Sequence, residues 1–335
     1  MLCEKNTIGY IRNHNVFPAR SCTFIMNRDH RAANKTGSFK TLLALILVFF
    51  SVNLGAQQTD NTDQRVNLTT IAEVNQTNNY ITFPINIGNM APLWFEANVV
   101  PNFYIRKSKN ARLMGVLTPQ IIIRMYQEES FPVRTPSYIP QISVYYSLTK
   151  DYINHQNTLF GRIAHHSNGQ SGSFFLPDGE INHLDGNFST NFVQLGIMHN
   201  RFNNKVNAAQ FFSTSVEVHP PGWSMEELDN QYSMVRWQNA FSIYKIPIGH
   251  SSQDQKSPSI SLKAEMMWMF GQINSWEEFS SNRLNLNFIL YYHPKFFEDI
   301  GFFVEVFSGM DYYNIYFDEK VEVLRFGIMT EKLRF

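Results

Sequence analysis

The sequence has little cysteine and no excess of either charge. Its two cysteines, Cys3 and Cys22, lie upstream of an apolar segment at 41–52, and the rest of the chain has none. If that segment is removed together with everything before it, disulfides, thiolate-bound metals and a cysteine nucleophile are all excluded. Lysine and arginine together number 28, and so do aspartate and glutamate. This balance argues against a nucleic-acid partner, which normally requires a basic face.

Long apolar runs are also lacking, since no run in the chain reaches the ~20 residues of a membrane-spanning helix. The run at 41–52, "TLLALILVFFSV", follows two nearby lysines and precedes "NLGAQQ". A basic region, a short apolar core and small residues form the layout of a secretory signal peptide. We therefore predict a signal peptide over 1–56, cleaved after Ala56. Met26 is a more plausible start than Met1 because it gives a signal of ordinary length.

Aromatic residues, by contrast, are abundant: the chain has 29 Phe, 15 Tyr and 5 Trp, yet its mean hydropathy is slightly negative. Residues 57–78 are rich in Asn, Gln and Thr, and we predict that they form a flexible polar lead-in. From 79 onward, apolar and polar residues alternate in strand-length runs, as in "SISLKAEMMWMF" at 259–270. Such alternation is typical of β-strands, and a tilted strand needs ~9–11 residues to cross a bilayer.

Twelve such runs are present, separated by turn residues, and they lie at 79–87, 93–105, 113–126, 138–148, 158–168, 188–199, 206–218, 232–246, 259–270, 283–293, 300–308 and 321–335. We therefore predict an all-β fold, a transmembrane antiparallel β-barrel of about twelve strands over 79–335, because bacterial single-chain barrels have an even number of strands. Pro84, Pro101 and Pro119 lie inside the first three runs and weaken those assignments. A soluble periplasmic β-sandwich is the alternative, since alternation alone does not distinguish the two folds.

The stretch "AHHSNGQSG" gathers groups that can carry chemistry. Alternate residues of a strand share a face, so His165 and Ser167 share the otherwise apolar face of Leu159 and Ile163. His166 falls on the opposite, polar face. In a transmembrane barrel the apolar face contacts lipid. We therefore predict that His165 and Ser167 point outward near the rim, and that His166 points into the lumen.

Histidine as base and serine as nucleophile are the minimum for acyl transfer. The backbone positions of His165 and Ser167 are ~6.5–7 Å apart on one strand, and an imidazole leaning along the strand can span that gap. The next run, "STNFVQLGI", places Asn191 on an outward, otherwise apolar face, and a neighbouring strand lies ~4.8 Å away. The Asn191 carbonyl oxygen can accept the Nδ1–H bond of His165 and fix its tautomer.

Two other interpretations of these residues stand beside the catalytic one. His165 and Ser167 can be ordinary rim residues of a porin, because a histidine two residues before a serine is a common pattern. The histidines can also form a transition-metal site, but His165 and His166 alternate to opposite sides of a strand, which argues against shared ligation. The candidate ligands of such a site are His165, His166, His183 and His199.

Three sequence blocks, in this order, resemble the outer-membrane phospholipase A family. The first is "ESFPVRTPSYIPQ" at 129–141, and the second is "HHSNG" at 165–169, which fits the family signature His-x-Ser-Asn-Gly. The third is "VFSGMDYYNIYF" at 306–317, which is similar to the last extracellular hairpin of the family. The resemblance implies a twelve-stranded barrel in the bacterial outer membrane that hydrolyses acyl esters of membrane phospholipids, requires calcium and is active as a homodimer.

The activity that the resemblance implies is that of a phospholipase A1 or A2, with lysophospholipase-like activity as well. The resemblance also implies the roles of individual residues. The nucleophile falls on Ser167, the base on His165 and the orienting asparagine on Asn191. The backbone N–H groups of Ser167 and Gly169 would face the oxyanion. A non-catalytic outer-membrane channel or structural barrel that has lost activity is the alternative function.

The calcium ligands implied by the resemblance are partly main-chain carbonyls, which match those of Phe131 and Gln170. Carbonyl ligation is indifferent to the side chain, and calcium accepts oxygen ligands of this kind. The segment 170–188 is longer than its family counterpart, so the side-chain ligand stays open among Ser173, Asp178, Asp185 and Asn187. For the same reason Asn187 competes with Asn191 as the partner of the catalytic histidine.

Overall fold

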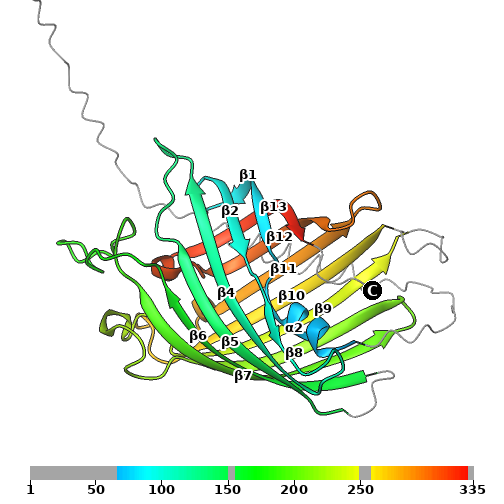
Figure 1. The fold of residues 1–335 in the computed structure, drawn as a ribbon. Coiled ribbons are helices and arrows are strands. Elements are labelled where there is room, and N and C mark those ends of the chain that lie inside the picture. Colours follow the sequence, from blue (N-terminus) through cyan, green and yellow to red (C-terminus); the bar gives the residue numbers. More distant parts are fainter. Residues whose placement is uncertain (1–65, 150–154, 249–257, 331–335) are drawn as a thin grey trace, which may run out of the picture. The chain divides into compact units, whose positions relative to one another are not determined.

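The computed structural model describes residues 66–149, 155–248 and 258–330. The predicted signal peptide and residues 57–65 of the predicted lead-in lie outside the described residues. The rest is mainly one antiparallel sheet (Figure 1). Its strands are β1 (Tyr80–Gly88), β2 (Leu93–Val99), β3 (Phe103–Ile105), β4 (Leu113–Tyr126), β5 (Ser137–Ser147), β6 (His155–Ser167), β7 (Ser189–Asn203), β8 (Ala208–Val218), β9 (Val235–Pro247), β10 (Ser259–Phe270), β11 (Leu284–His293), β12 (Ile300–Met310) and β13 (Lys320–Thr330).

The sheet closes into a barrel because β2 pairs with both β1 and β4. β3 also pairs with β4, further along the same strand, so β2 and β3 are two parts of one wall strand. Pro101 lies in the gap between them, where a residue without an N–H group cannot continue the ladder. The prediction of a transmembrane antiparallel barrel of about twelve strands is therefore confirmed, and this break produces one extra strand.

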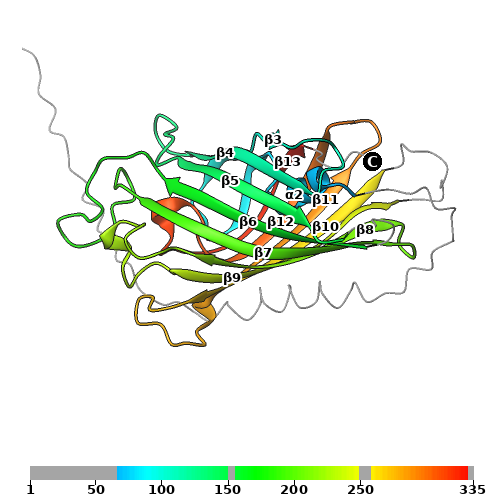
Figure 2. The same cartoon turned by 60° about the horizontal axis from the view of Figure 1, so that its bottom comes forward.

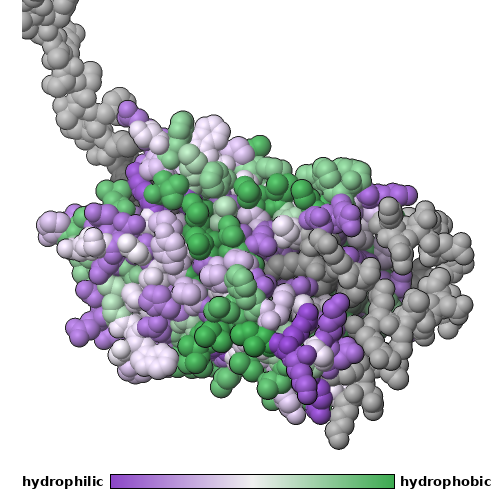
Figure 3. Space-filling model, viewed as in Figure 1, coloured by the Kyte–Doolittle hydropathy of each residue, from purple (hydrophilic) through white to green (hydrophobic). Residues whose placement is uncertain are grey.

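The wall of the barrel is apolar outside and polar inside. In β10, Ser261 and Lys263 are buried in the interior, whereas their neighbours Ile260 and Leu262 face outward. Figure 3 shows hydrophobic residues gathered in patches over one part of the outer surface. Among the apolar side chains exposed on the wall, Leu195 of β7 is 65% exposed. A soluble barrel has the reverse arrangement. This one is stable only where an apolar medium surrounds the wall, as a bilayer does.

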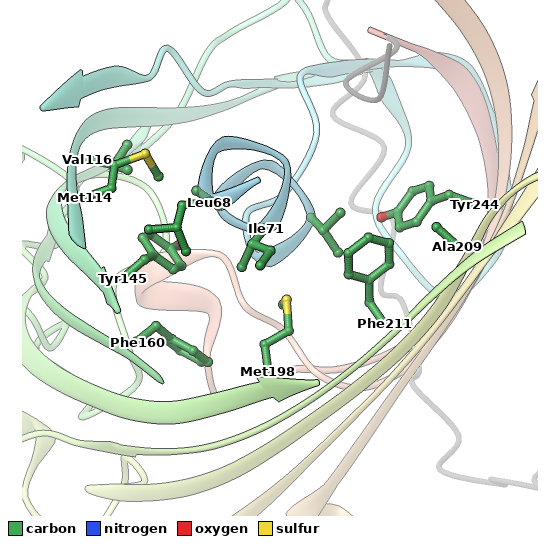
Figure 4. Packing of buried hydrophobic residues seen from close by; sticks show 12 residues of the cluster. Leu68, Ile71, Met114, Val116, Tyr145, Phe160, Met198, Ala209, Phe211 and Tyr244 are labelled. Atoms are coloured by element: carbon green, nitrogen blue, oxygen red, sulfur yellow. The ribbon is translucent and has the colours of Figure 1, made fainter. Parts of the chain in front are cut away.

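A short helix, α2 (Leu68–Asn75), fills one end of the lumen. Asn67 caps the helix by accepting a hydrogen bond from Thr70 N at 3.1 Å, and Leu68 and Ile71 lie on its buried face. Figure 4 shows this face packed among side chains of the surrounding wall, which include Met114, Tyr145, Phe160, Met198 and Phe211. None of the helices among the described residues is long and apolar enough to span a membrane.

The position of α2 differs from the expectation that residues 57–78 form a flexible lead-in. Leu68, Ile71 and Ala72 have the i, i+3, i+4 spacing of an apolar helix face, and Asn67 is a favourable N-cap residue. The surrounding Asn, Gln and Thr residues hid this short signal. Burial against the inner wall stabilises the helix, which is too short to be stable in isolation.

Packed loops lie at the other end of the barrel, where β6 ends and β7 begins. Figure 2 shows β4, β5, β6 and β7 side by side on the wall that leads to this end. Aromatic and aliphatic side chains of four loops form a second core there. Its buried members include Phe174, Phe188, Leu228, Tyr232, Tyr313, Ile315 and Phe317. The loops at this rim are therefore packed structures that can hold a site in a fixed geometry.

Candidate active site

His165 and Ser167 lie at the C-terminal end of β6, next to these packed loops. The register of the sheet places His165 opposite Asn191 of β7, and Ser167 between Tyr138 of β5 and Ser189 of β7. His165 and Ser167 are partly exposed on the outer wall, whereas the intervening His166 is buried on the inner face. The side chains of His165 and Ser167 thus face the medium that surrounds the barrel.

The side chains of His165 and Asn191 are joined by a hydrogen bond of 2.9 Å between Nδ1 and Oδ1. Asn191 Nδ2 donates to the main-chain carbonyl of Trp223 at 2.6 Å. Because that nitrogen is committed to a carbonyl, the amide oxygen must face His165, and His165 must donate its Nδ1–H. The neutral ring then carries a free lone pair on Nε2, which is the tautomer that a general base needs.

The other candidate partner of the histidine, Asn187, lies in the preceding loop, where its N–H donates to Gly172 O at 3.0 Å. The structure therefore pairs His165 with Asn191 and not with Asn187. No hydrogen bond between Ser167 Oγ and His165 Nε2 is formed among the described residues. Such bonds are often long in unliganded enzymes and shorten when substrate binds.

Asn168, which follows the serine, holds the two ends of the next loop together through its side chain, a role that the sequence analysis did not predict. Its side chain is 1% exposed and donates to Gly186 O at 2.7 Å. Its Oδ1 accepts from Gln170 N at 3.2 Å and from Phe188 N at 3.0 Å. One side chain thus ties the start of the 170–188 loop to its end. The available signal was an asparagine flanked by serine and glycine, a composition typical of turns.

Gly169 gives the chain its sharp turn after β6. Its φ is +66°, and a Cβ at this position would lie 3.2 Å from the Tyr138 ring. Both constraints favour glycine over other residues. Among the described residues no acceptor takes the Gly169 N–H. A free main-chain donor next to Ser167 is what a developing oxyanion requires.

The four side chains considered as calcium ligands belong to one loop, and their hydrogen bonds differ. Asp178 caps an exposed turn, and Asp185 Oδ1 accepts from Asn182 Nδ2 at 2.7 Å. Ser173 offers its main-chain carbonyl to the same Asn182 at 3.1 Å. Asn187 differs from these, because its buried Oδ1 has no hydrogen-bond partner among the described residues.

The two ends of the loop that hold Gln170 and Asn187 are joined, since Asn187 N donates to Gly172 O, and Gln170 N and Phe188 N both donate to Asn168 Oδ1. Phe131 lies in the loop before β5, with a φ of +47°, and its ring packs against Trp94 at 5.5 Å. No hydrogen bond among the described residues joins Phe131 to Gln170 or Asn187. No cluster of three or more His, Cys, Asp or Glu side chains suited to a metal occurs in the described ranges. The candidate ligand atoms in these loops are all oxygens, which suit calcium better than the transition metals that bind nitrogen or sulfur.

The three sequence blocks meet at this rim. Asn314, in the loop after β12, donates to Thr135 O at 2.6 Å and to Ser137 Oγ at 2.8 Å. Ser137 Oγ lies 3.1 Å from His166 Nε2, on the inner face of the strand that carries His165 and Ser167. A hydrogen-bonded chain therefore runs from the last loop of the barrel to the strand that bears the site.

The long loop at 170–188 docks on the last loop through His183. Its ring stacks on Tyr316 at 4.7 Å, and its nitrogens lie 3.2 Å from Asp318 and 3.4 Å from Glu319. Burial disfavours the charged imidazole, but the hydrogen bond and negative charge of Asp318 outweigh burial and raise the pKa of His183. Burial also raises the pKa of Glu319. Asp311 and Arg124 are the other charged groups that act on this pair.

We expect the docking of this loop to be tighter at acidic pH. A histidine whose pKa is raised on docking stabilises the docked state below its undocked pKa, and the effect is lost as pH rises through the docked pKa. The raised pKa of Glu319 acts in the same direction. The protection factors of the 170–188 amides, corrected for the intrinsic exchange rate at each pH, should be higher at pH 5.5 than at pH 8.5, and His183→Gln should flatten the difference. An unchanged pH dependence in that variant would contradict the assignment.

The fold and this site define a class: a transmembrane β-barrel of the outer-membrane type, with a paired histidine and asparagine beside a serine on its outer wall. No family model matches the chain, and no curated protein matches it. Among solved structures, outer membrane phospholipase A from Escherichia coli is similar at a TM-score of 0.52 and 13% identity, over 83% of this chain and 96% of that chain. An active-site mutant of that protein, at pH 6.1, gives a TM-score of 0.52 and 12% identity, over 82% of this chain and 95% of that one.

A third similar structure is the outer membrane phospholipase dimer of Salmonella typhi with bound calcium. Its TM-score is 0.52 at 12% identity, over 76% of this chain and 90% of that one. At these identities the likeness shows the fold, and the chain spans nearly the whole length of each protein that it resembles.

Proposed function

We propose that this protein is a calcium-dependent serine hydrolase of the outer membrane, related to the phospholipase A family, that cleaves acyl ester bonds of phospholipids. The observation that carries the proposal is the 2.9 Å bond between His165 and Asn191 on the outer wall, next to Ser167. Histidine and serine facing lipid are costly as wall residues. Their position is explained if their substrate arrives through the membrane.

In this proposal, Ser167 Oγ attacks the ester carbonyl of a phospholipid while His165 Nε2 takes the hydroxyl proton. The tetrahedral intermediate collapses, the ester C–O bond breaks, and the leaving lysophospholipid alkoxide receives the proton from His165. Water then attacks the acyl-serine by the same route in reverse and releases a fatty acid. Asn191 accepts the Nδ1–H bond throughout and stabilises the imidazolium. The N–H groups of Ser167 and Gly169 face the oxyanion.

The residues that would hold calcium are the carbonyls of Phe131 and Gln170 and the Oδ1 of Asn187, which has no partner in the described part of the chain. Ser173 is the weaker choice of side chain. Bound there, calcium would add positive charge near the oxyanion. The outward-facing side chains around the site, Ile163 and Leu195, are 57% and 65% exposed. A second copy of the chain against this wall would form an apolar cleft for the acyl chain, which supports a homodimer as the active form.

The direct test is hydrolysis of a phospholipid by the purified protein in detergent micelles. We expect fatty acid release in the presence of Ca²⁺, loss of release after EDTA treatment, and recovery when excess Ca²⁺ is restored. Chemical crosslinking at the same Ca²⁺ concentrations should show a dimer that follows activity. Hydrolysis unaffected by EDTA would remove calcium from the proposal, and a folded protein without hydrolysis in Ca²⁺ would overturn the enzymatic function.

The second candidate function is a non-catalytic channel, which the polar lumen favours. A cavity of about 400 Å³, lined by groups such as Arg162, Glu217 and Lys263, lies inside the barrel. α2 packs against the wall at one end of the lumen, and the packed loops lie at the other end. Planar bilayer recording separates the two functions, since steady conductance without hydrolysis would favour the channel.

A further inference from the structure

Asn191 is itself held by a turn that lies beyond the three catalytic side chains. Its main-chain N–H and its Nδ2 both donate to the carbonyl of Trp223, at 3.0 and 2.6 Å. Trp223 ends a four-residue turn that starts at Pro220, closed by a bond from Trp223 N to Pro220 O at 3.0 Å. Gly222 has a φ of +76°, as the third position of a type II turn requires. The turn therefore presents one carbonyl oxygen to Asn191.

Both ends of this turn are tied to one buried hydroxyl. Thr190, the neighbour of Asn191 in β7, is 0% exposed, and its Oγ1 lies 2.7 Å from His219 Nδ1 and 2.6 Å from Ser224 Oγ. His219 precedes the turn and Ser224 follows it. Because Thr190 bonds both residues, it holds the two ends of the turn in place and thereby fixes the position of the Trp223 carbonyl.

The hydrogen-bond directions in this cluster follow from Glu217. Its carboxylate lies 3.1 Å from His219 Nε2, and it also accepts from Arg236 at 3.1 Å. A carboxylate accepts only, so Nε2 carries the proton and Nδ1 accepts from the Thr190 hydroxyl. Thr190 Oγ1 then accepts from Ser224. Burial lowers the pKa of His219, which keeps the ring neutral and this order of bonds intact.

We propose that Thr190 and His219 are positioning residues of the acyl-transfer site: through the Trp223 carbonyl they fix the amide of Asn191 and thereby the tautomer of His165. The inference rests on the proposed function and extends it to residues on the inner side of the wall. Neither residue touches substrate. Both residues act indirectly. If the Trp223 carbonyl is not held in place, Asn191 Nδ2 loses its fixed acceptor, and the amide can flip so that its oxygen no longer faces His165.

The test is Thr190→Val, which keeps the branched shape and removes the hydroxyl. We expect kcat for phospholipid hydrolysis to fall about 10- to 100-fold with KM unchanged, the cost of a small misplacement of a catalytic group. Thr190→Ser should restore most of the activity. The matched control is Thr158→Val in the same wall, because Thr158 is also 0% exposed and its hydroxyl has no partner among the described residues. That variant should keep full activity.

A double variant separates positioning from general loss of structure. Adding Thr190→Val to Asn191→Ala should cause no further loss of kcat, because the network acts only through Asn191. Effects that multiply, or a Thr190→Val enzyme within twofold of the wild type in kcat, would overturn the inference. Heat-modifiable migration on gels verifies that each variant forms a folded barrel.

A readout independent of activity keeps the two proposals distinguishable. In protein labelled with ¹⁵N-histidine, the ring nitrogens of His165, assigned with a His165→Gln variant, should report an Nδ1–H tautomer in the wild type. We expect a mixed tautomer in Thr190→Val and not in Thr158→Val. A wild-type protein with this tautomer but no hydrolysis would overturn the proposed function alone. An unchanged tautomer in Thr190→Val would overturn the positioning role even in an active enzyme.

Discussion

Ser167→Ala should reduce phospholipid hydrolysis at least about 10³-fold while leaving a folded barrel. In the proposed mechanism the hydroxyl is the group that forms the acyl bond, and alanine leaves nothing at this position for His165 to activate. The substitution lies on the outer wall, where Ser167 is partly exposed and makes no side-chain hydrogen bond among the described residues. Its loss should therefore cost little stability.

The matched control is Ser189→Ala. Ser189 lies directly opposite Ser167 in the next strand and is also partly exposed. Both variants should show the same shift between heated and unheated gel samples, and only Ser167→Ala should be inactive in fatty acid release from micelles. Undiminished hydrolysis by Ser167→Ala would end the assignment of this serine as nucleophile.

Arg124→Met should destabilise the protein by about 3–5 kcal/mol, the cost of leaving a buried charge without its partner. Arg124 is 3% exposed and bonds both oxygens of Asp311, at 2.6 and 2.8 Å, as well as Glu96 at 2.7 Å. Glu96 keeps a second partner in Arg325, at 2.7 Å. The variant therefore leaves Asp311 as the uncompensated charge, at the base of the loop that docks on the site.

Urea unfolding in detergent micelles, followed by tryptophan fluorescence, measures this loss. The control is Arg134→Met, because Arg134 pairs with Glu128 at the surface and exposed pairs of this kind contribute at most about 1 kcal/mol. Equal and small losses in the two variants would show that the buried network does not stabilise the barrel.

Much of the fold follows from local patterns. A two-residue period over bilayer-spanning lengths predicted the strands, and the same period placed His165 and Ser167 together on the outward face. The break at Pro101 and the helix at 68–75 did not follow. In the first case Pro101 was visible inside the run at 93–105, but only the pairing with β4 shows that this run forms two strands. In the second case a polar composition hid a short apolar face, which is stable only against the inner wall.

The candidate site likewise has features that the sequence shows and features that only the tertiary structure shows. The types and spacing of its groups are visible in the chain, and Asn191 is one of two asparagines that the sequence offers as partner of the histidine. The choice between them depends on the register of β6 against β7, which sets His165 opposite Asn191. Asn168 and Thr190 were not singled out, because their partners are main-chain carbonyls, amides and side chains of distant loops.

The sequence by itself determined the class of barrel, the outward face of the serine and histidine, and the kinds of groups available for acyl transfer, because side-chain alternation is a local property of a strand. Tertiary structure alone decided which asparagine meets the imidazole, where the loops pack, and which carbonyl holds the amide. Those contacts join residues whose separation along the chain carries no periodic signal, and only the closure of the sheet brings them together.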